Sequence, residues 1–598
     1  MKDKILKNFF AASGIIFGFA FLLRLLFWFF LKRNYFFYGH PADDVIYYQE
    51  WAREISRLDW LGTKTFFGLP LYPYFLAVLD RLFLGQEILI RLFHLLLGSF
   101  NCVLAFILAR KIFSQKTALL AGILAATNFS LIYYDWMFLP VSLVITLSLL
   151  ILIILASPDQ IQTRRGGFLL GILLGLTALG DGKILIFSSL IIIFIHSKGK
   201  ITAVIQKSLL LILGLMLILG LTGLRNKLVG GSWVWITAQR GLSFYVGNNP
   251  QATGVFANPD FIRPTHQGQD IDQIMRAELL SGRKLTAAQV SQFWFKEGVS
   301  FIQNQPLDYL KLLGRKFVLF FRDTERASDI DLLLLREWRQ CLDINPFYLI
   351  CPLALIGIFL TRRREETKFS NLLLLSQLIF TLIFFLYNRQ RVTVLPVFLI
   401  YEAFTLCWII EQFKRKNFRS LIYQAAAMLT FLILLKPQTL DSQTFDFLRH
   451  AKAGPIYEKR KEFKKAQEEY FKALKLEPRD TNTLYNLANS FFLEGDFIPA
   501  ERYYKEVLTL NPHQTDALFN LGYVYEERKD LAQALVFYEK VLELEGPNVD
   551  TYLRIAQVYQ TRGECDKAQR YYQEILQIKP HLAEEIKEIF LSCVDIEK

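Results

Sequence analysis

Long apolar runs separated by short polar segments occupy most of the first 435 residues of the chain. A helix needs about 20 apolar residues to cross the hydrocarbon core of a bilayer, and most of these runs reach that length or fall a few residues short of it. The pattern predicts eleven membrane-spanning helices, at 9–31, 88–110, 117–135, 136–156, 167–181, 183–197, 203–224, 346–361, 369–387, 392–411 and 419–435.

Two further apolar segments, 69–84 and 307–321, are interrupted by charged residues. Charged side chains are costly at the centre of a bilayer. We therefore expect both segments to form helices that lie along the membrane interface. If both instead cross the membrane, the number of spans rises to thirteen.

The pattern changes after residue 450, where similar segments end in proline at intervals of 34, 35 and 33 residues, at Pro478, Pro512, Pro547 and Pro580. This period resembles the tetratricopeptide repeat, a helix-turn-helix unit of about 34 residues. Each copy has a small residue in its first helix, and an alanine and a tyrosine in its second. The small residues are Gly454, Ala488, Gly522 and Ala556. The alanines are Ala466, Ala500, Ala534 and Ala568, and the tyrosines are Tyr470, Tyr504, Tyr538 and Tyr572. Four copies exceed the three or so that a stable solenoid needs.

The sequence thus predicts an all-α chain, in which a polytopic helical membrane domain with about 11–13 spans precedes a tetratricopeptide α-solenoid. The predicted parts are a membrane domain at 1–436 with external loops at 32–87 and 225–345, a linker at 437–450, and a repeat domain at 451–598 that ends in a capping helix at 583–592.

Charge divides the chain at the same place. Residues 451–598 carry 21 Lys and Arg against 26 Asp and Glu, a net charge of −5, whereas the remainder carries 47 against 29, a net charge of +18. Loop charge on a membrane protein explains this basic excess better than nucleic-acid binding, because no basic stripe with interleaved aromatic residues occurs.

The basic residues of the membrane domain also predict its orientation. With eleven spans, six basic clusters fall on the same side as the N-terminus, which the positive-inside rule assigns to the cytoplasm. They are Lys2/Lys4/Lys7, Arg110/Lys111/Lys116, Arg164/Arg165, Lys198/Lys200, Arg362/Arg363/Arg364 and Lys414/Arg415/Lys416. We expect a multi-pass protein of the cell (inner) membrane whose two long loops and whose repeats face outward.

Candidate chemistry lies in the first external loop, in the stretch GHPADDVIYYQEWAREI (39–55). Asp44, Tyr48 and Ala52 are four residues apart and share one face if the segment is helical. A carboxylate at the membrane surface can accept a proton from a reacting hydroxyl. The alternative is that Asp43 or Asp44 only caps this helix. Binding of a hydrated divalent cation by the two carboxylates is a further alternative.

Three segments resemble glycosyltransferase family 39, a family of polytopic C-type glycosyltransferases that use lipid-phosphate sugars. The first consists of DDVIYYQEWAREI (43–55), LPLYPYFLAVLDRLFLG (69–85) and Arg91. The second is RNKLVGGSWVWITAQRGLSFYVGNNPQATG (225–254), and the third is YNRQRVTVLPVFLIYEA (387–403). The resemblance spans roughly residues 1–411 in scattered motifs. The segment ALGDGKILIF (178–187) departs from it, because the family has an arginine-containing turn there; Lys183 can stand in for that arginine.

The resemblance implies that the acid after the first span is the catalytic base, which places that role on Asp44, with Asp43 as a substitute. A lipid phosphate leaves as an anion and is stabilised by cations. The residues that the resemblance assigns to donor-phosphate or substrate binding, or to organising the site, are Tyr48, Arg91, Asp135, Lys183, Arg389 and Arg391. Anchoring at lipid headgroups is the alternative role for the external arginines.

The resemblance therefore implies an integral-membrane glycosyltransferase that moves a sugar from a polyprenyl-phosphate carrier to an acceptor on the extracytoplasmic face. The repeats would dock the acceptor, a protein or a glycan, or a partner protein, with their concave surface as the expected binding face. Two alternatives stay open: an O-antigen ligase or oligosaccharyltransferase, and a membrane-anchored scaffold without catalysis. The residues show no metal-ligand spacing, and LGDGKI (179–184) lacks the first glycine and the Ser/Thr of a P-loop.

Overall fold

A computed structural model of the chain consists of helices that form two compact units, residues 1–439 and 440–598. It describes residues 2–34, 43–57, 60–62, 64–157, 163–196, 201–259, 261–262, 266–322, 345–435, 442–578 and 586. Within these ranges the only β pairing is an isolated parallel bridge between Val255 and Leu386. The predicted all-α class, with apolar helices followed by repeats, is confirmed.

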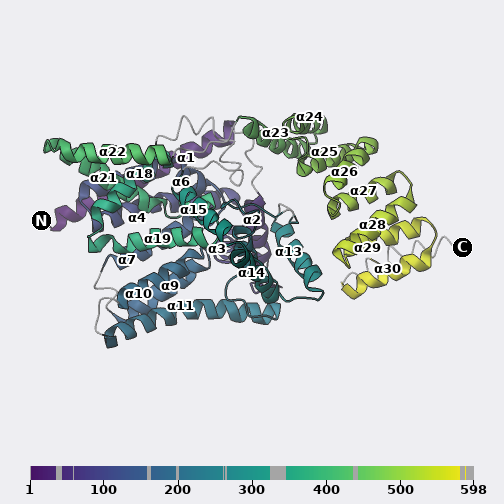
Figure 1. Cartoon of the computed structure of the whole chain (residues 1–598), viewed down its shortest axis with the longest axis horizontal. Helices are drawn as coiled ribbons and strands as arrows, with labels where there is room; N and C mark the ends of the chain where they lie inside the picture. The colour runs from purple at the N-terminus through teal and green to yellow at the C-terminus, as the bar shows by residue number, and fades with distance from the viewer. Residues whose placement is uncertain are drawn as a thin grey trace. The chain divides into compact units, whose positions relative to one another are not determined.

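The first unit is a bundle of apolar helices (Figure 1). Its helices are α1 (Lys2–Asn34), α4 (Glu87–Ile112), α5 (Gln115–Thr127), α6 (Phe129–Trp136), α7 (Val141–Leu155), α9 (Arg164–Ala178), α10 (Lys183–His196), α11 (Ile201–Gly230), α18 (Phe347–Thr361), α19 (Lys368–Ile383), α21 (Leu395–Lys414) and α22 (Phe418–Leu434). The short 3-10 helix Glu365–Thr367 precedes α19.

Four helices of the described residues are long and apolar enough to cross a membrane, or five if a bent pair counts as one span. Five shorter apolar helices accompany them. The unit is therefore multi-pass, while the number of eleven to thirteen spans stays a prediction.

The bent pair occupies the span predicted at 117–135. Helices α5 and α6 meet at an angle of 54°. Asn128 lies between them and caps α6, because its Oδ1 accepts a hydrogen bond from the backbone N–H of Leu131 at 3.1 Å. A short polar side chain that satisfies a helix N-terminus favours a new helix start over continuation of the old one.

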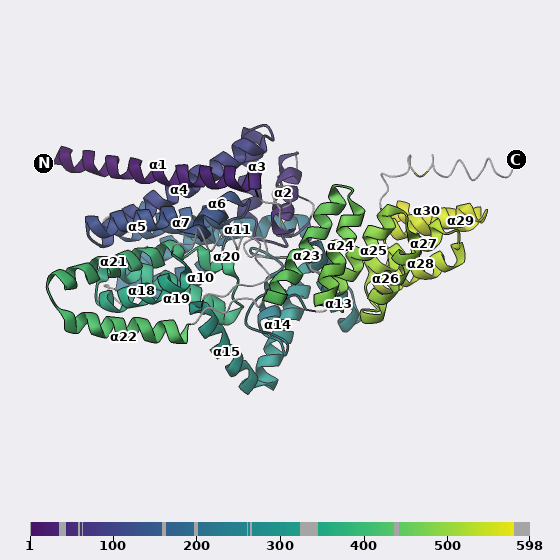
Figure 2. The ribbon, with the colours of Figure 1, turned by 90° about the horizontal axis from the view of Figure 1, so that it is seen from above.

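Smaller helices from the two long loops, together with the short helix α20 between α19 and α21, gather at the end of the bundle away from the N-terminus (Figure 2). They are α2 (Asp43–Ser56), α3 (Leu71–Leu82), α12 (Arg240–Gly247), α13 (His266–Ser281), α14 (Ala287–Asn304), α15 (Pro306–Phe321) and α20 (Asn388–Val392). Helices α3 and α15 correspond to the two segments predicted to lie along the interface, and neither is among the helices long and apolar enough to span.

Basic residues from several predicted cytoplasmic loops meet at the other end. The Arg110 guanidinium, at the end of α4, lies 4.7 Å from the ring centre of Phe9 in α1. Arg364 lies 5.7 Å from the ring of Phe113 and 5.4 Å from that of Phe404. The two ends of the bundle thus differ: one carries these arginines, and the other carries the loop helices.

A buried ion pair joins the middle of the bundle. Arg24 in α1 donates from Nε to Asp135 Oδ2 at 2.7 Å, and the side chains are 1% and 4% exposed. Ser142 in α7 donates to the other oxygen of the same carboxylate. Gly98 in α4 leaves room for this carboxylate, because a Cβ there would approach Asp135 to 2.1 Å. Burial without partners would be costly for either charge.

The second unit is a row of helix pairs: α23 (Ser442–Lys459) with α24 (Phe463–Leu476), α25 (Thr481–Glu494) with α26 (Phe497–Leu510), α27 (Thr515–Glu527) with α28 (Leu531–Glu545), and α29 (Val549–Thr561) with α30 (Cys565–Ile578). Helix α23 begins inside the segment predicted as a linker. Apart from Ile586, the predicted capping helix at 583–592 lies outside the described residues.

Tyrosines fill the space inside each repeat. Tyr470, Tyr504 and Tyr538 are completely buried, and Tyr572 is 2% exposed. Two of them lie against a glycine of the first helix: a Cβ at Gly454 would approach the Tyr470 ring to 2.2 Å, and a Cβ at Gly522 would approach the Tyr538 ring to 2.7 Å. The positions identified from the period are thus the ones that pack the solenoid.

We expect the fragment 440–598 to fold alone, because its contacts form a separate compact unit and each repeat packs on its neighbours. In this fragment, Gly522→Val should lower the free energy of unfolding by about 1–3 kcal/mol, because it overpacks the Tyr538 site. Thermal unfolding followed by circular dichroism measures this. The matched control is Ala532→Val on an exposed site of α28. Equal melting of both variants would contradict the packing argument.

Candidate active site

Asp44 lies in the first turn of α2. The buried face of this helix, which includes Val45, Tyr48 and Ala52, packs against α3. The Asp44 carboxylate is paired with the guanidinium of Arg389, which is 345 residues away in sequence. The Tyr387 hydroxyl also donates a hydrogen bond to Asp44 Oδ2 at 3.3 Å. The site therefore joins the first and the last of the three motifs.

Both charged groups remain accessible, because the side chains of Asp44 and Arg389 are 24% and 21% exposed. A carboxylate in this state can accept a proton, and a guanidinium can bind a phosphate in a bidentate manner. The Arg389 guanidinium also lies 4.5 Å from the ring centre of Tyr387, which restricts its position.

Tyr48 lies one turn after Asp44 and is 5% exposed. Burial raises the pKa of its hydroxyl above the usual value, Arg389 opposes this shift, and Asp44 adds to it. Its ring meets Tyr72 of α3 edge-on at 5.3 Å. The Tyr72 hydroxyl in turn lies 3.3 Å from His94 Nε2 in α4. Tyr48 is thus close to both charged groups and is connected through Tyr72 to α4.

Arg91 lies in the first turn of α4 and is held against α6 and the turn that follows it. Its guanidinium donates to the carbonyl oxygen of Trp136 at 3.0 Å and lies 4.5 Å from the ring of Phe138. The side chain is 13% exposed. His94 packs edge-on against the same Phe138 ring at 5.4 Å. Arg91 therefore neighbours the Tyr72–His94 pair, and no contact between Arg91 and Asp44 is seen.

Arg389 and Arg391 lie in α20, and Lys183 of α10 contacts Thr393 directly after that helix. Arg391 donates to the carbonyl oxygen of Arg322 at 2.6 Å, and its guanidinium lies 4.0 Å from the ring of Phe347. Lys183 is completely buried, pairs with Asp181, and donates to the hydroxyl of Thr393. Of these cations, Arg389 is the one that contacts Asp44.

The loop motif GNN (247–249) positions the segment that carries Arg389. Gly247 packs directly on the backbone of Phe384, where a Cβ would approach the carbonyl oxygen to 2.0 Å. Asn248 donates to the carbonyl oxygen of Ile383 at 2.8 Å. A few residues later, the N–H of Leu386 donates to Gly254 O at 2.9 Å.

Lys316 of α15 supports the same turn from inside. Its ammonium group donates to Asn248 Oδ1 at 3.0 Å and to Leu382 O at 3.1 Å. Burial lowers the pKa of this lysine to about 7. The motif therefore has a structural role here.

Asp135 is separate from this group. Its carboxylate contacts Arg24 and Ser142 and packs against Gly98 of the facing helix α4. Gly98 lies seven residues after Arg91 in that helix. Seven helical residues correspond to about 10 Å. The side chain of Asp43 lies outside the described residues. Among the described residues, no group of three or more His, Cys, Asp or Glu could hold a metal ion.

The sequence pattern did not predict several residues that contact the candidate site. Tyr387 and Thr393 lie in the segment 387–403, where neither residue alone indicates a site. His94 lies inside an apolar run, where a lone histidine gives no signal of its own. Which of the distant segments contact one another depends on tertiary packing.

Known protein families match part of each unit. Residues 68–222 match the family described as dolichyl-phosphate-mannose-protein mannosyltransferase. The membrane unit resembles these enzymes. This match confirms the resemblance to family 39 for that part of the chain. The matched range contains Tyr72, Arg91, Asp135 and Lys183 and lies between Asp44 and Arg389.

Residues 481–514 and 514–580 match tetratricopeptide-repeat families. Among solved structures, the chain is similar to MamA at 24% identity (25% of this chain, 87% of MamA, TM-score 0.22). It is similar to YrrB at 22% identity (29% and 86%, TM-score 0.23). It is also similar to PilF of Pseudomonas aeruginosa at 24% identity (28% and 72%, TM-score 0.21). No curated protein matches the chain.

The contact between Gly247 and Phe384 predicts that Gly247→Ala will reduce sugar transfer without loss of the protein. The added Cβ must push away the segment that carries Tyr387 and Arg389. A displacement of about 1 Å in a reactive group can cost about 10²-fold in rate. The rate is measured with purified protein in lipid, and Gly314→Ala, where a Cβ meets nothing within 4 Å, is the control. Equal rates in the two variants would show that the turn does not position the site.

Proposed function

We propose that the chain transfers a sugar from a polyprenyl-phosphate carrier to an acceptor on the extracytoplasmic face of the membrane. The observation that carries the proposal is the contact between Asp44 and Arg389, which places a proton acceptor beside an anion-binding group. The similarity of residues 68–222 to lipid-phosphate mannosyltransferases supports this class of donor.

In the proposed reaction, an acceptor hydroxyl attacks the anomeric carbon of the sugar. The bond between that carbon and the phosphate oxygen breaks, and the lipid phosphate leaves with the electron pair. Asp44 takes the hydroxyl proton, so it acts as general base, with Asp43 as a secondary candidate. A single displacement of this kind inverts the anomeric centre.

Arg389 has two roles in this scheme. Without donor, its guanidinium neutralises Asp44. The phosphodiester of the donor carries one negative charge and competes with Asp44 for the guanidinium. Its arrival would draw Arg389 away from the carboxylate. The base would then be released when the donor is bound. Arg91 would contribute positive charge from α4, and Lys183 and Arg391 would hold α20 in place.

The charge of the loops supports the proposed orientation in the inner membrane. Basic residues gather at the end of the bundle opposite the loop helices, and basic loops remain preferentially in the cytoplasm. Asp44 would then face outward together with the repeats. There the repeats would dock the acceptor, or a protein that delivers it.

Asp44→Asn is expected to reduce turnover by at least about 10²-fold, because general-base catalysis contributes about 10²–10⁴ in rate. The variant keeps the size of the side chain but removes its basicity. The measurement is transfer of radiolabelled sugar from a polyprenyl-phosphate donor by purified protein in lipid. Asp43→Asn should cost much less, and Glu50→Gln on the exposed side of α2 is the control.

Full activity of Asp44→Asn would refute its role as the base. Full activity of the Asp43→Asn, Asp44→Asn double variant would refute acid-base chemistry at this stretch altogether. Absence of transfer from every lipid-phosphate donor by the unmodified chain would favour the scaffold alternative.

The orientation predicts which single cysteines react in intact spheroplasts. In a cysteine-free background, Glu50→Cys on α2 and Ser442→Cys at the start of the repeat unit should react with an impermeant thiol reagent. Arg363→Cys, between α18 and α19, should react only after the membrane is opened. Protection of Ser442→Cys together with labelling of Glu50→Cys would place the repeats on the cytoplasmic side.

A further inference from the structure

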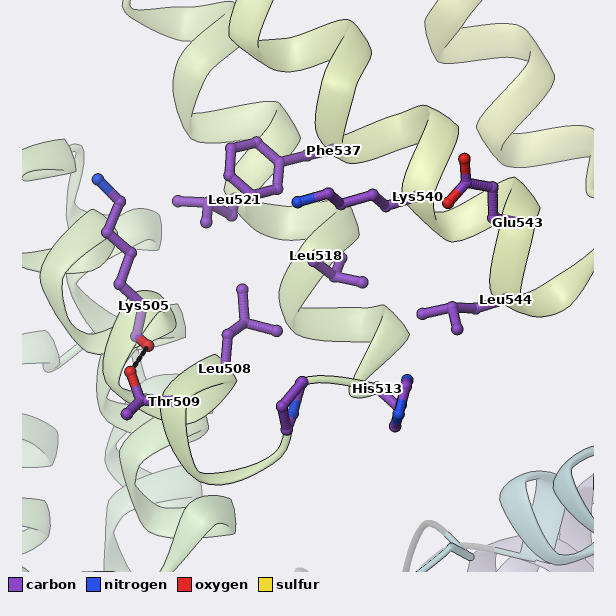
Figure 3. Close-up of a pocket in the computed structure, with 11 residues that line it drawn as sticks. Lys505, Leu508, Thr509, His513, Leu518, Leu521, Phe537, Lys540, Glu543 and Leu544 are labelled. Atoms are coloured by element: carbon purple, nitrogen blue, oxygen red, sulfur yellow. Dashed lines mark hydrogen bonds between the residues drawn. The ribbon is translucent and has the colours of Figure 1, made fainter.

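The repeat unit contains a hollow of about 610 Å³ between α26, α27 and α28 (Figure 3). Its walls come from the second helices of two successive repeats and from the first helix between them. It is therefore distinct from a surface formed by the first helices alone.

The floor of the hollow is apolar. Leu508 of α26, Leu518 and Leu521 of α27, and Phe537 and Leu544 of α28 line it. Leu518 and Leu521 are buried, whereas Leu544 is 36% exposed. In Figure 3 the side chains of Leu508 and Leu518 point into the space between the helices. A volume of this size accommodates one or two large side chains of a ligand.

The rim is basic. Lys505 and Lys540 lie on opposite sides of the hollow, and His513 and Glu543 complete it. Lys540 extends from α28 across the hollow, and its ammonium group lies 5.4 Å from the ring centre of Phe537. Lys505 is paired with Glu501 at 2.6 Å. Lys540 thus carries the charge that faces the apolar floor.

The hydrogen-bonding capacity of the floor is low. The hydroxyl of Thr509 donates back to the carbonyl oxygen of Lys505 at 2.9 Å, so it is already used within α26. A sugar needs several hydrogen-bond partners around its ring, and leaving them unmade is costly. An apolar side chain has no such requirement and gains from burial.

From these observations we propose that the hollow binds a peptide segment in which a large apolar side chain is flanked by Asp or Glu. The apolar side chain fills the floor formed by Leu518, Leu521 and Phe537. The neighbouring carboxylates contact the ammonium group of Lys540. The partner is therefore a protein with an acidic and apolar surface segment, and it binds independently of the chemistry at Asp44.

The test uses the full chain in nanodiscs of phosphatidylcholine and fluorescence anisotropy of three labelled peptides. The first has Phe-Leu between pairs of acidic residues, the second has Phe-Leu between pairs of lysines, and the third has Ser-Ser between the acidic residues. Only the first should bind, and its affinity should fall as salt is raised, because exposed charges are screened. Equal binding of all three peptides would overturn the proposal.

Variants place the binding in the hollow. Lys540→Glu and Leu544→Ser should each weaken the first peptide at least about fivefold, and Glu543→Lys should tighten it. The matched controls lie on other exposed sites, Lys475→Glu on α24 and Ile498→Ser on α26, and should bind as the unmodified chain does. Unchanged affinity in Lys540→Glu, or no gain in Glu543→Lys, would exclude this site even if the peptide binds elsewhere.

Discussion

The need to give each buried charged side chain a polar partner governs the membrane unit. Arg24 and Asp135 illustrate this constraint, because each is almost fully buried and each is satisfied by the other. The pair joins α1 to α6, and Ser142 brings α7 into the same network. Removing one partner would leave a buried charge uncompensated, which is among the most destabilising changes known in proteins. Lys183 and Asp181 repeat the same solution near α20.

The site at Asp44 depends on a second level of organisation, in which distant loops support one another. Gly247 and Asn248 hold the backbone at Phe384 and Ile383, and that backbone continues into Tyr387 and Arg389. The contacts come from three parts of the chain that are separated by more than a hundred residues. The rigid bundle supplies the frame, while these loops supply the reactive groups.

Much of the fold was predictable from the sequence because it follows from local periodicity. The apolar runs predicted helices, and the spacing of the prolines and tyrosines predicted the repeats, which the buried Tyr504 and Tyr538 confirm. The break at Asn128 was missed, because a single asparagine in an apolar run has little effect on an average hydropathy. The roles of the site residues remain predictions, although Arg389 and Asp44 do lie together. The pairing of Asp135 with Arg24 could not be predicted, since it depends on packing between helices.

The length of α7 and α18 has a consequence for their surroundings. Each has 15 residues, which corresponds to about 22 Å of helix, whereas the hydrocarbon core of a bilayer is about 30 Å thick. A bilayer adapts to such a hydrophobic mismatch by becoming thinner around the short helices. Helix α7, however, has no exposed residue, and α18 has only Phe359 exposed. Neighbouring helices therefore surround these short helices, and protein rather than lipid covers their ends.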